Sequence, residues 1–150
     1  MICILAAGLL FASRCIAGED LDLKEVLPQA GSFKPVNKGT EVIYYKAEDK
    51  SGKLMGAVFK ASGKSYGGNI DTLVGMLKDG TITAIKVLLQ NETPGIGSRI
   101  TEPEFTGRVR DIKDISRVQA ITGATVSSQV VIESVKKKAE EIKQLMEGAE

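Results

Sequence analysis

The 150-residue sequence contains no histidine, no tryptophan and only two cysteines. Without histidine, the chain lacks the commonest general base, the Ser-His and Cys-His nucleophile pairs, and most zinc and haem sites. The cysteines, Cys3 and Cys15, cannot hold a metal cluster alone, and their place in or beside an apolar run indicates packing rather than a disulfide. We therefore predict no metal site, and any redox or transfer chemistry needs a bound cofactor.

Aromatic residues and excess charge are also scarce. Aromatics make up 5% of the chain, and the formal net charge is +1 at pH 7. Nucleic-acid-binding domains need a basic surface or aromatic stacking platforms, so we predict no nucleic-acid partner. The hydrophobic content of 43% and charged content of 26% are typical of a globular domain, and the length suffices for one core.

The N-terminus is apolar but short. Residues 1–12, MICILAAGLLFA, carry no charge, and as a helix they would span about 18 Å of a hydrocarbon core about 30 Å thick. Three interpretations stay open: a signal-peptide apolar region, the remnant of a transmembrane anchor, and a buried core helix. A signal peptide would have Lys or Arg before the run. We favour an anchor remnant over residues 1–18, followed by one domain over residues 19–150.

Hydrophobic periodicity predicts an α+β fold, with a mostly antiparallel sheet and flanking N- and C-terminal helices. A short helix is expected over residues 19–27 and a long amphipathic helix over residues 130–146, whose apolar positions recur on one face. Two hairpins are predicted, the second of them turning at Asp79-Gly80. Their strands cover residues 41–47, 53–61, 69–78 and 81–90. Loops are expected over residues 29–40 and 62–68, a short helix over 103–108, and a short strand over 116–121.

Three polar segments are candidates for a binding site: residues 65–68 (SYGG), 92–97 (ETPGIG) and 122–128 (TGATVSS). The first two flank the hairpin that turns at Asp79-Gly80, so they are expected to lie together at the end away from its turn. The third precedes the long helix, and helix N-termini bind phosphate through free N–H groups and the helix dipole. The segments therefore suit a flat, phosphate-bearing ligand. The alternative is ordinary turn chemistry, with Thr125 or Ser127 as the helix N-cap.

In this order, the three segments resemble signatures of the FMN-binding domain found in two related proteins. These are the G subunit of the Rnf ion-translocating electron-transport complex and the C subunit of the sodium-translocating NADH:quinone reductase. Residues 122–125 match Ser/Thr-Gly-Ala-Thr, residues 91–100 match the second signature, and residues 66–71 match the third. Glu25-Val26-Leu27-Pro28 after an apolar N-terminus is more similar to the Rnf protein. The resemblance covers residues 20–146.

The resemblance implies that FMN is bound, and that a separate flavin transferase attaches it to Thr125 through a phosphoester. It also places residues 92–97 against the isoalloxazine ring. The family usually has an acidic residue where this chain has Gln119, which would affect recognition by the transferase or the way the loop is held, but leaves the acceptor hydroxyl. The implied cofactor-binding residues are Tyr66, Gly67, Gly68, Glu92, Thr93, Pro94, Gly95, Ile96, Gly97, Thr122, Gly123, Ala124, Thr125, Ser127 and Ser128.

The implied function is that of an electron-transfer subunit of a membrane-bound ion-translocating oxidoreductase complex. Its partners would be the other subunits of the complex and the flavin transferase. A single N-terminal anchor would sit in the cell inner or plasma membrane, with the domain on the extracytoplasmic side. No side chain is required as an acid or base, so no catalytic residue is predicted. Two alternatives stay open: a membrane-linked reductase with dissociable FMN, and a cofactor-free membrane-anchored interaction domain.

Overall fold

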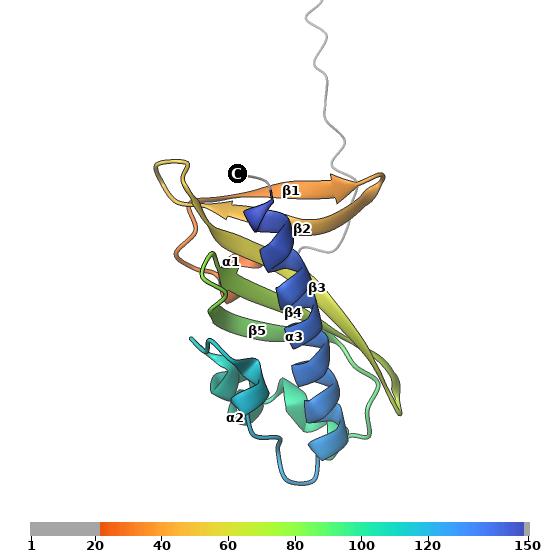
Figure 1. The fold of residues 1–150 in the computed structure, drawn as a ribbon. Helices are drawn as coiled ribbons and strands as arrows, with labels where there is room; N and C mark the ends of the chain where they lie inside the picture. Colours follow the sequence, from red (N-terminus) through yellow and green to blue (C-terminus); the bar gives the residue numbers. More distant parts are fainter. Residues whose placement is uncertain (1–21, 149–150) are drawn as a thin grey trace, which may run out of the picture.

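A five-stranded antiparallel sheet forms the centre of the domain, with the strands in chain order (Figure 1). The computed structural model describes residues 22–148, so the prediction for residues 1–18 lies outside the described residues. The strands are β1 (Ser32–Lys38), β2 (Glu41–Glu48), β3 (Leu54–Ser65), β4 (Gly68–Leu77) and β5 (Ile82–Leu89). With the short helix α1 (Leu23–Val26) before the sheet and the long helix α3 (Thr125–Glu147) after it, the predicted α+β fold is confirmed.

Both predicted hairpins are present. The turn between β4 and β5 lies at Asp79-Gly80, where Gly80 has a φ of +90° and the Asp79 carboxylate accepts a hydrogen bond from the Thr81 N–H at 2.9 Å. The prediction of a loop over residues 62–68 is wrong, because β3 extends to Ser65 and pairs with β4 as far as the pair Ser65–Gly68. The turn between the two strands consists of Tyr66 and Gly67. Cross-strand pairing along the whole length of β4 outweighs the low strand propensity of the glycines and serines here.

Two further predictions are corrected. Residues 32–38, expected in a loop because of the surrounding Gly31, Pro35 and Gly39, form strand β1. β1 lies at the edge of the sheet, where a proline costs no interior ladder hydrogen bond. The strand expected over residues 116–121 is instead a 3-10 turn, η3 (Ile115–Arg117), followed by extended chain. The Asp114 carboxylate caps η3 by accepting from the Ser116 N–H, a local bond that competes with strand pairing.

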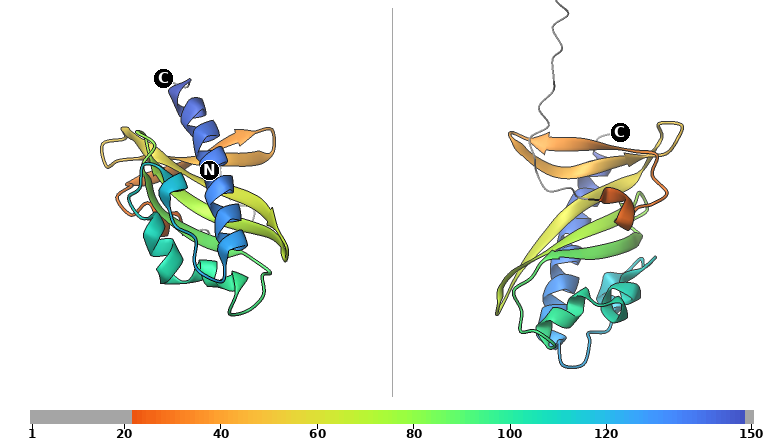
Figure 2. Two further views of the ribbon diagram at one scale, coloured as in Figure 1. Left: turned by 60° about the horizontal axis from the view of Figure 1, so that its bottom comes forward. Right: turned by 180° about the vertical axis from the view of Figure 1, so that it is seen from behind.

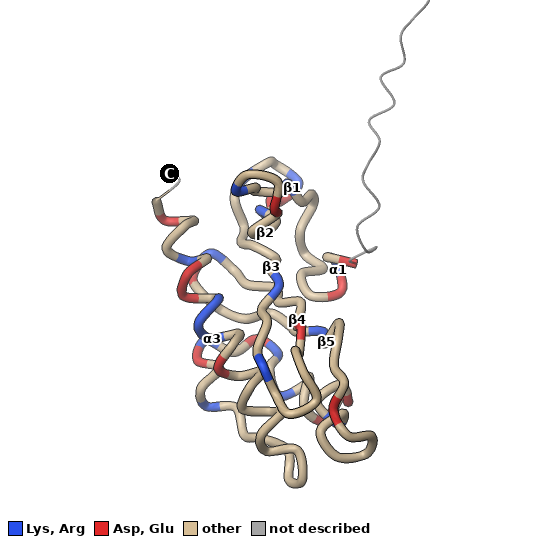
Figure 3. Tube along the Cα trace, turned by 90° about the vertical axis from the view of Figure 1, so that its right-hand side faces the viewer, with Lys and Arg blue, Asp and Glu red and all other residues tan. Residues whose placement is uncertain are grey.

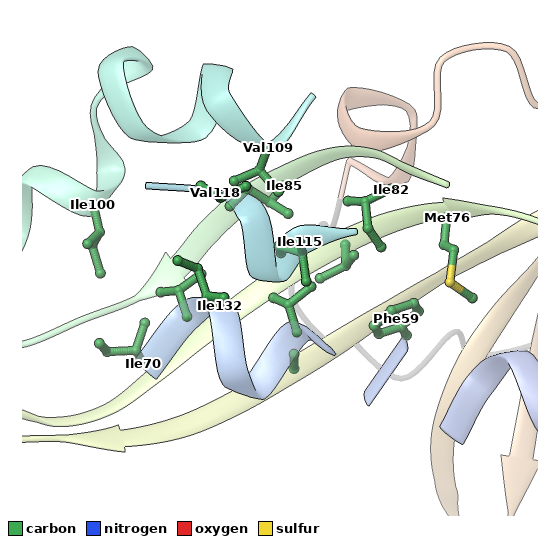
Figure 4. Packing of buried hydrophobic residues seen from close by; sticks show 14 of the residues in the cluster. Phe59, Ile70, Met76, Ile82, Ile85, Ile100, Val109, Ile115, Val118 and Ile132 are labelled. Carbon is green, nitrogen blue, oxygen red and sulfur yellow. The ribbon is translucent and has the colours of Figure 1, made fainter. Parts of the chain in front are cut away.

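The main core lies between α3 and one face of the sheet. The predicted apolar face of α3 is confirmed, since Val131, Val135, Ile142 and Met146 are buried. Figure 4 shows Phe59 of β3 and Ile70 and Met76 of β4 within this core. The remaining side of the core is closed by η1 (Gly97–Thr101), α2 (Pro103–Thr106), η2 (Gly107–Val109) and η3. α2 and η2 match the short helix predicted over residues 103–108.

The opposite face of the sheet carries a smaller core. α1 lies on this face, away from α3 (Figure 2). Val26 and Leu27, at the end of α1, are buried there with Val58 of β3 and Leu73 of β4. The Thr83 hydroxyl donates a buried hydrogen bond to the Val26 carbonyl, which fastens α1 to β5. Among residues 22–148, no helix combines the length and apolarity needed to cross a bilayer.

Candidate functional site

The three predicted segments line one cavity of about 460 Å³. They come together at the end of the molecule where α3 begins, whose place in the fold can be followed in Figure 1. The cavity is lined by the β3–β4 turn, the loop after β5 and the first turn of α3. The expected adjacency of the hairpin ends is thus confirmed, and the helix N-terminus joins them. The predicted residues that line the cavity are Tyr66, Gly67, Glu92, Thr93, Ile96, Gly97, Gly123, Ala124, Thr125 and Ser127.

Five predicted residues do not line the cavity, namely Gly68, Pro94, Gly95, Thr122 and Ser128. Ser128 is fully buried beneath the motif, and its hydroxyl accepts a hydrogen bond from the Ile121 N–H at 3.2 Å. Two further lining residues, Asn91 and Val126, were not among the predicted cofactor-binding residues. Asn91 lies in the matched signature 91–100 and Val126 in the segment 122–128, so the motifs themselves already contained both.

Glu92 joins the three segments. Its carboxylate accepts hydrogen bonds from the Ser65 hydroxyl at 3.0 Å, from the Gly67 N–H at 2.9 Å and from the Ser127 hydroxyl. Partial burial raises the pKa of the Glu92 carboxyl, but the bonds from Ser127, Gly67 and Ser65 together outweigh burial and hold this pKa below its ordinary value. Glu92 is therefore a structural carboxylate that stays ionised and ties the hairpin, its own loop and α3 together.

Gly97 allows this tie to form. A Cβ at position 97 would lie 2.7 Å from both the Glu92 Cβ and the Ser127 Oγ, which is closer than van der Waals contact allows. The glycine at the end of the 92–97 signature thus keeps the space in which the Glu92–Ser127 hydrogen bond lies.

The first turn of α3 has no side-chain cap. Ala124 is the N-cap residue and offers no hydrogen-bonding side chain, so the interpretation of Thr125 or Ser127 as the N-cap is wrong. The first backbone N–H groups of an α-helix have no acceptor within the helix. With a 23-residue helix behind them, these groups face the cavity with a positive dipole end.

The hydroxyls of the 122–128 motif differ in their surroundings. Those of Ser127 and Ser128 are buried and hydrogen-bonded within the protein. Thr122 is exposed but lies outside the cavity lining. Thr125 is exposed, lines the cavity, and has no hydrogen-bond partner for its hydroxyl within residues 22–148. Among the hydroxyls of this motif, that of Thr125 is therefore the one that is exposed to solvent, lies in the cavity lining and is free to bind a ligand.

The chain before Thr125 is held by its backbone. Residues 121–124 form a tight turn closed by a 2.9 Å hydrogen bond from the Ala124 N–H to the Ile121 carbonyl, and Gly123 supplies the φ of +85° that favours glycine. Gln119, where the resemblance to the FMN-binding domain implies an acidic residue, is exposed, and its carbonyl accepts from Arg108 at 3.0 Å. This contact does not depend on the side chain at position 119.

Among the residues that line the cavity, Glu92 is the one that carries a charge. Residues 65–70, 93–98 and 118–132 contain no Lys, Arg, Asp or Glu, and charged residues concentrate elsewhere along the trace (Figure 3). The rim instead exposes apolar side chains: Tyr66 is 91% exposed, Ile96 55% and Val126 45%. A flat apolar ring system would find van der Waals partners there, while the α3 N-terminus attracts an anion.

Within residues 22–148, no group of His, Cys, Asp and Glu side chains is arranged to hold a metal ion. The model of the FMN-binding domain matches residues 65–140, which include all three cavity-lining segments. The chain belongs to the FMN-binding domain family. The prediction of FMN as the cofactor is thereby confirmed.

Relatives of this FMN-binding domain include components of ion-translocating complexes. The chain is 40% identical to the G subunit of the ion-translocating oxidoreductase complex of Methanosarcina acetivorans, over 75% of this chain and 69% of the relative. It is 32% identical to the G subunit of the proton-translocating ferredoxin:NAD(+) oxidoreductase complex of Clostridium ljungdahlii, over 80% of this chain and 69% of the relative. The resemblance to the G subunit is thus confirmed.

Solved structures share the fold of the FMN-binding domain. NqrC of Shewanella oneidensis superposes with a TM-score of 0.55 at 22% identity, over 83% of this chain and 75% of that one. The C subunit of the Na(+)-translocating NADH-quinone reductase from Parabacteroides distasonis gives a TM-score of 0.54 at 18% identity, over 80% of this chain and 79% of that one. At these identities the likeness establishes the fold.

Proposed function

We propose that this FMN-binding domain is the electron-transfer subunit of a membrane-bound ion-translocating oxidoreductase complex, and that Thr125 carries its FMN through a phosphoester bond. The proposal rests on the position of Thr125, which is the first residue of α3 and lines the cavity. Its hydroxyl has no hydrogen-bond partner within residues 22–148. The relatives named as G subunits of such complexes support the role in electron transfer. The other subunits would be its partners, and the apolar residues 1–18 its membrane anchor on the extracytoplasmic side.

The residues of the cavity fit FMN. A volume of about 460 Å³ lies within the range of small-molecule sites, about 300–1,000 Å³. The free N–H groups at the start of α3 suit the phosphate, and Tyr66, Ile96 and Val126 offer apolar surface for the rings. The carboxylate in the cavity lining, that of Glu92, accepts three hydrogen bonds from protein donors. These bonds stabilise its negative charge, which reduces its repulsion of a phosphate bound at the start of α3.

Attachment requires an activated donor, because a phosphomonoester and an alcohol do not condense spontaneously in water. The donor we propose is a phosphoanhydride of FMN, presented by a flavin transferase. The Thr125 hydroxyl oxygen forms a bond to phosphorus while the anhydride P–O bond breaks. The hydroxyl proton passes to a base of the transferase, and the other half of the anhydride leaves as a nucleoside monophosphate that keeps the bridging oxygen. The exposure of Thr125 at the helix start gives the transferase access to the hydroxyl.

FMN, when bound, supplies one- and two-electron redox chemistry. The chain's own residues contribute binding and orientation. The α3 N-terminus would neutralise part of the phosphate charge, and Glu92 and Gly97 keep the three segments in contact. In the 92–97 loop the N–H groups of Glu92, Gly95 and Ile96 are bonded within the protein, so Thr93 and Gly97 would supply the backbone donors to the ring system. A covalent tether prevents loss of the cofactor, which suits a domain outside the cytoplasm.

The test is flavin fluorescence on the protein band after denaturing electrophoresis, following co-expression with a flavin transferase. The unchanged chain should fluoresce, and Thr125→Val should abolish the signal while the protein stays folded. Thr125→Ser keeps a hydroxyl and should retain fluorescence. The control is Thr40→Val, which alters an exposed threonine in the β1–β2 turn, away from the cavity, and should leave the fluorescence unchanged.

Fluorescence that persists in Thr125→Val would refute the phosphoester at this residue. Flavin that co-purifies with the folded protein but is released on denaturation would instead favour a reductase with dissociable FMN. Expression without the transferase should yield the apo-protein.

A further inference from the structure

Two arginines and one glutamate hold the loop that leads into Thr125. Arg99 lies in η1, Glu104 in α2 and Arg108 in η2, so all three come from the segment that follows the 92–97 loop. The Glu104 carboxylate bridges the arginines: its Oε2 lies 2.8 Å from Arg99 Nη2, and its Oε1 lies 3.1 Å from Arg108 Nη2. We call these three residues the arginine clamp.

The clamp binds the backbone of the motif loop. Arg99 Nη1 donates to the Thr122 carbonyl at 2.9 Å, and Arg108 Nη1 donates to the carbonyls of Gln119 at 3.0 Å and Ala120 at 3.3 Å. The Ile121 carbonyl accepts from the Ala124 N–H. All four consecutive carbonyls from residue 119 to residue 122 therefore accept hydrogen bonds. The loop itself contains no charged residue, and the arginines of the neighbouring segment hold three of these carbonyls.

This arrangement bears directly on the orientation of Thr125. The loop ends at the N-cap Ala124, one residue before Thr125, so a shift of the 119–122 backbone moves the start of α3 and the acceptor hydroxyl with it. On the other side, the Glu92–Ser127 bond holds the first turn of the helix against the cavity. Thr125 thus lies between two points of attachment, both supplied by the segment 92–108.

We propose that Glu104, through Arg99 and Arg108, is a positioning residue that sets the Thr125 hydroxyl for flavin attachment. This inference rests on the proposed function. A guanidinium that bonds both a carboxylate and a backbone carbonyl is held in a single orientation by its planar fork. Without the Glu104 charge, Arg108 loses its carboxylate partner and Arg99 keeps only the longer contact with Glu102, so both guanidinium groups are oriented less firmly toward the loop. A small displacement of a reacting group costs up to about a hundredfold in rate.

The chain offers a matched control for Glu104. Glu102 also contacts Arg99, at 3.6 Å from its Nε, but does not bridge to Arg108, and its side chain is 50% exposed against 48% for Glu104. Glu104→Gln and Glu102→Gln therefore remove the same charge at similar exposure, and only the first breaks the bridge.

The experiment compares the full-length chain and both variants as acceptors for a flavin transferase, with a phosphoanhydride of FMN as donor. For Glu104→Gln we expect the kcat of attachment to fall about tenfold or more, with the KM for the acceptor chain within about twofold. Glu102→Gln should match the unchanged chain. Hydrogen exchange of the Ile121 and Ala124 amides in the apo-protein should be faster in Glu104→Gln alone, because these amides report how firmly the loop is held.

Equal kcat values in the two variants would overturn the positioning role, and so would a kcat loss without faster exchange at Ile121 and Ala124. Should Glu104→Gln fold poorly, Arg108→Lys replaces it, since a lysine amine cannot bond Glu104 and two carbonyls in the same geometry; the same kcat loss is expected. If the unchanged chain takes up no flavin, the proposed function itself fails. Uptake by the unchanged chain with equal variant rates refutes only the role of Glu104.

Discussion

Removal of the Glu92 carboxylate should loosen the cavity and destabilise the whole domain. Glu92→Ala deletes the acceptor of three hydrogen bonds that connect β3–β4, the 92–97 loop and α3. The donors differ in what they lose. Ser127 is only 3% exposed, so its hydroxyl is left without an acceptor, whereas Gly67 is exposed and its N–H can turn to water.

The magnitude follows from this difference. A buried hydroxyl without a partner costs about 1–3 kcal/mol, and each bond that water replaces costs about 0.5 kcal/mol. We therefore expect Glu92→Ala to lower the free energy of unfolding by about 2–4 kcal/mol, which corresponds to a fall in melting temperature of roughly 6–12 °C for a domain of this size. Glu92→Gln should cost about 1 kcal/mol, since its amide can still accept from Gly67 and donate to the two hydroxyls.

The effect should depend on pH with a defined sign. The folded pKa of Glu92 lies below its ordinary value of 4.5, so the carboxylate stabilises the native state fully above about pH 4.5. As pH falls through the lower folded pKa, the carboxyl is protonated in both states and this contribution is lost. The stability difference between the unchanged chain and Glu92→Ala should thus be constant above about pH 5 and shrink below about pH 4.5.

Urea unfolding of the apo-protein, followed by circular dichroism at several pH values, measures both quantities. Glu102→Ala serves as the control, because Glu102 is exposed and makes one long ion pair, and it should change stability by less than about 0.5 kcal/mol. A Glu92→Ala variant as stable as the control at pH 7 would refute the assignment of Glu92 as the tie between the three segments.

Two further predictions concern packing. Gly97→Ala should destabilise the domain by about 1–3 kcal/mol in urea unfolding and reduce flavin loading in the fluorescence assay, because its Cβ would lie 2.7 Å from Glu92 Cβ and Ser127 Oγ; loading equal to that of the unchanged chain would contradict this. Phe59→Ala, at a side chain 1% exposed in the centre of the core, should cost about 3–5 kcal/mol by the same measurement, and a loss below about 1 kcal/mol would contradict the packing shown in Figure 4.

The parts of the fold that sequence reasoning predicts are those with strong local signals. The Asp79-Gly80 turn and the apolar face of α3 follow from turn chemistry and a 3.6-residue period. Sequence reasoning misses β1 because a proline and neighbouring glycines outweigh a few strand-forming residues locally, whereas pairing with β2 at the sheet edge decides the structure. It misses the end of β3 for the same reason, since only pairing with β4 makes a strand of residues 62–65.

For the candidate site, the sequence alone predicted the three segments that line the cavity and, through the resemblance of its motifs, the family and its cofactor. The hairpin connectivity also predicted that residues 65–68 and 92–97 lie close together, and both segments line the cavity. Only the tertiary structure decided which hydroxyls of residues 122–128 are hydrogen-bonded and which are free. The Ser127 hydroxyl bonds Glu92, and the Ser128 hydroxyl bonds the Ile121 N–H, whereas that of Thr125 has no partner within residues 22–148. The Glu92–Ser127 bond joins residues far apart in the chain, so the sequence could not predict it. The arginine clamp has the same origin, since Arg99 and Arg108 reach the 119–122 backbone, and Glu104 reaches both arginines, only in the folded chain.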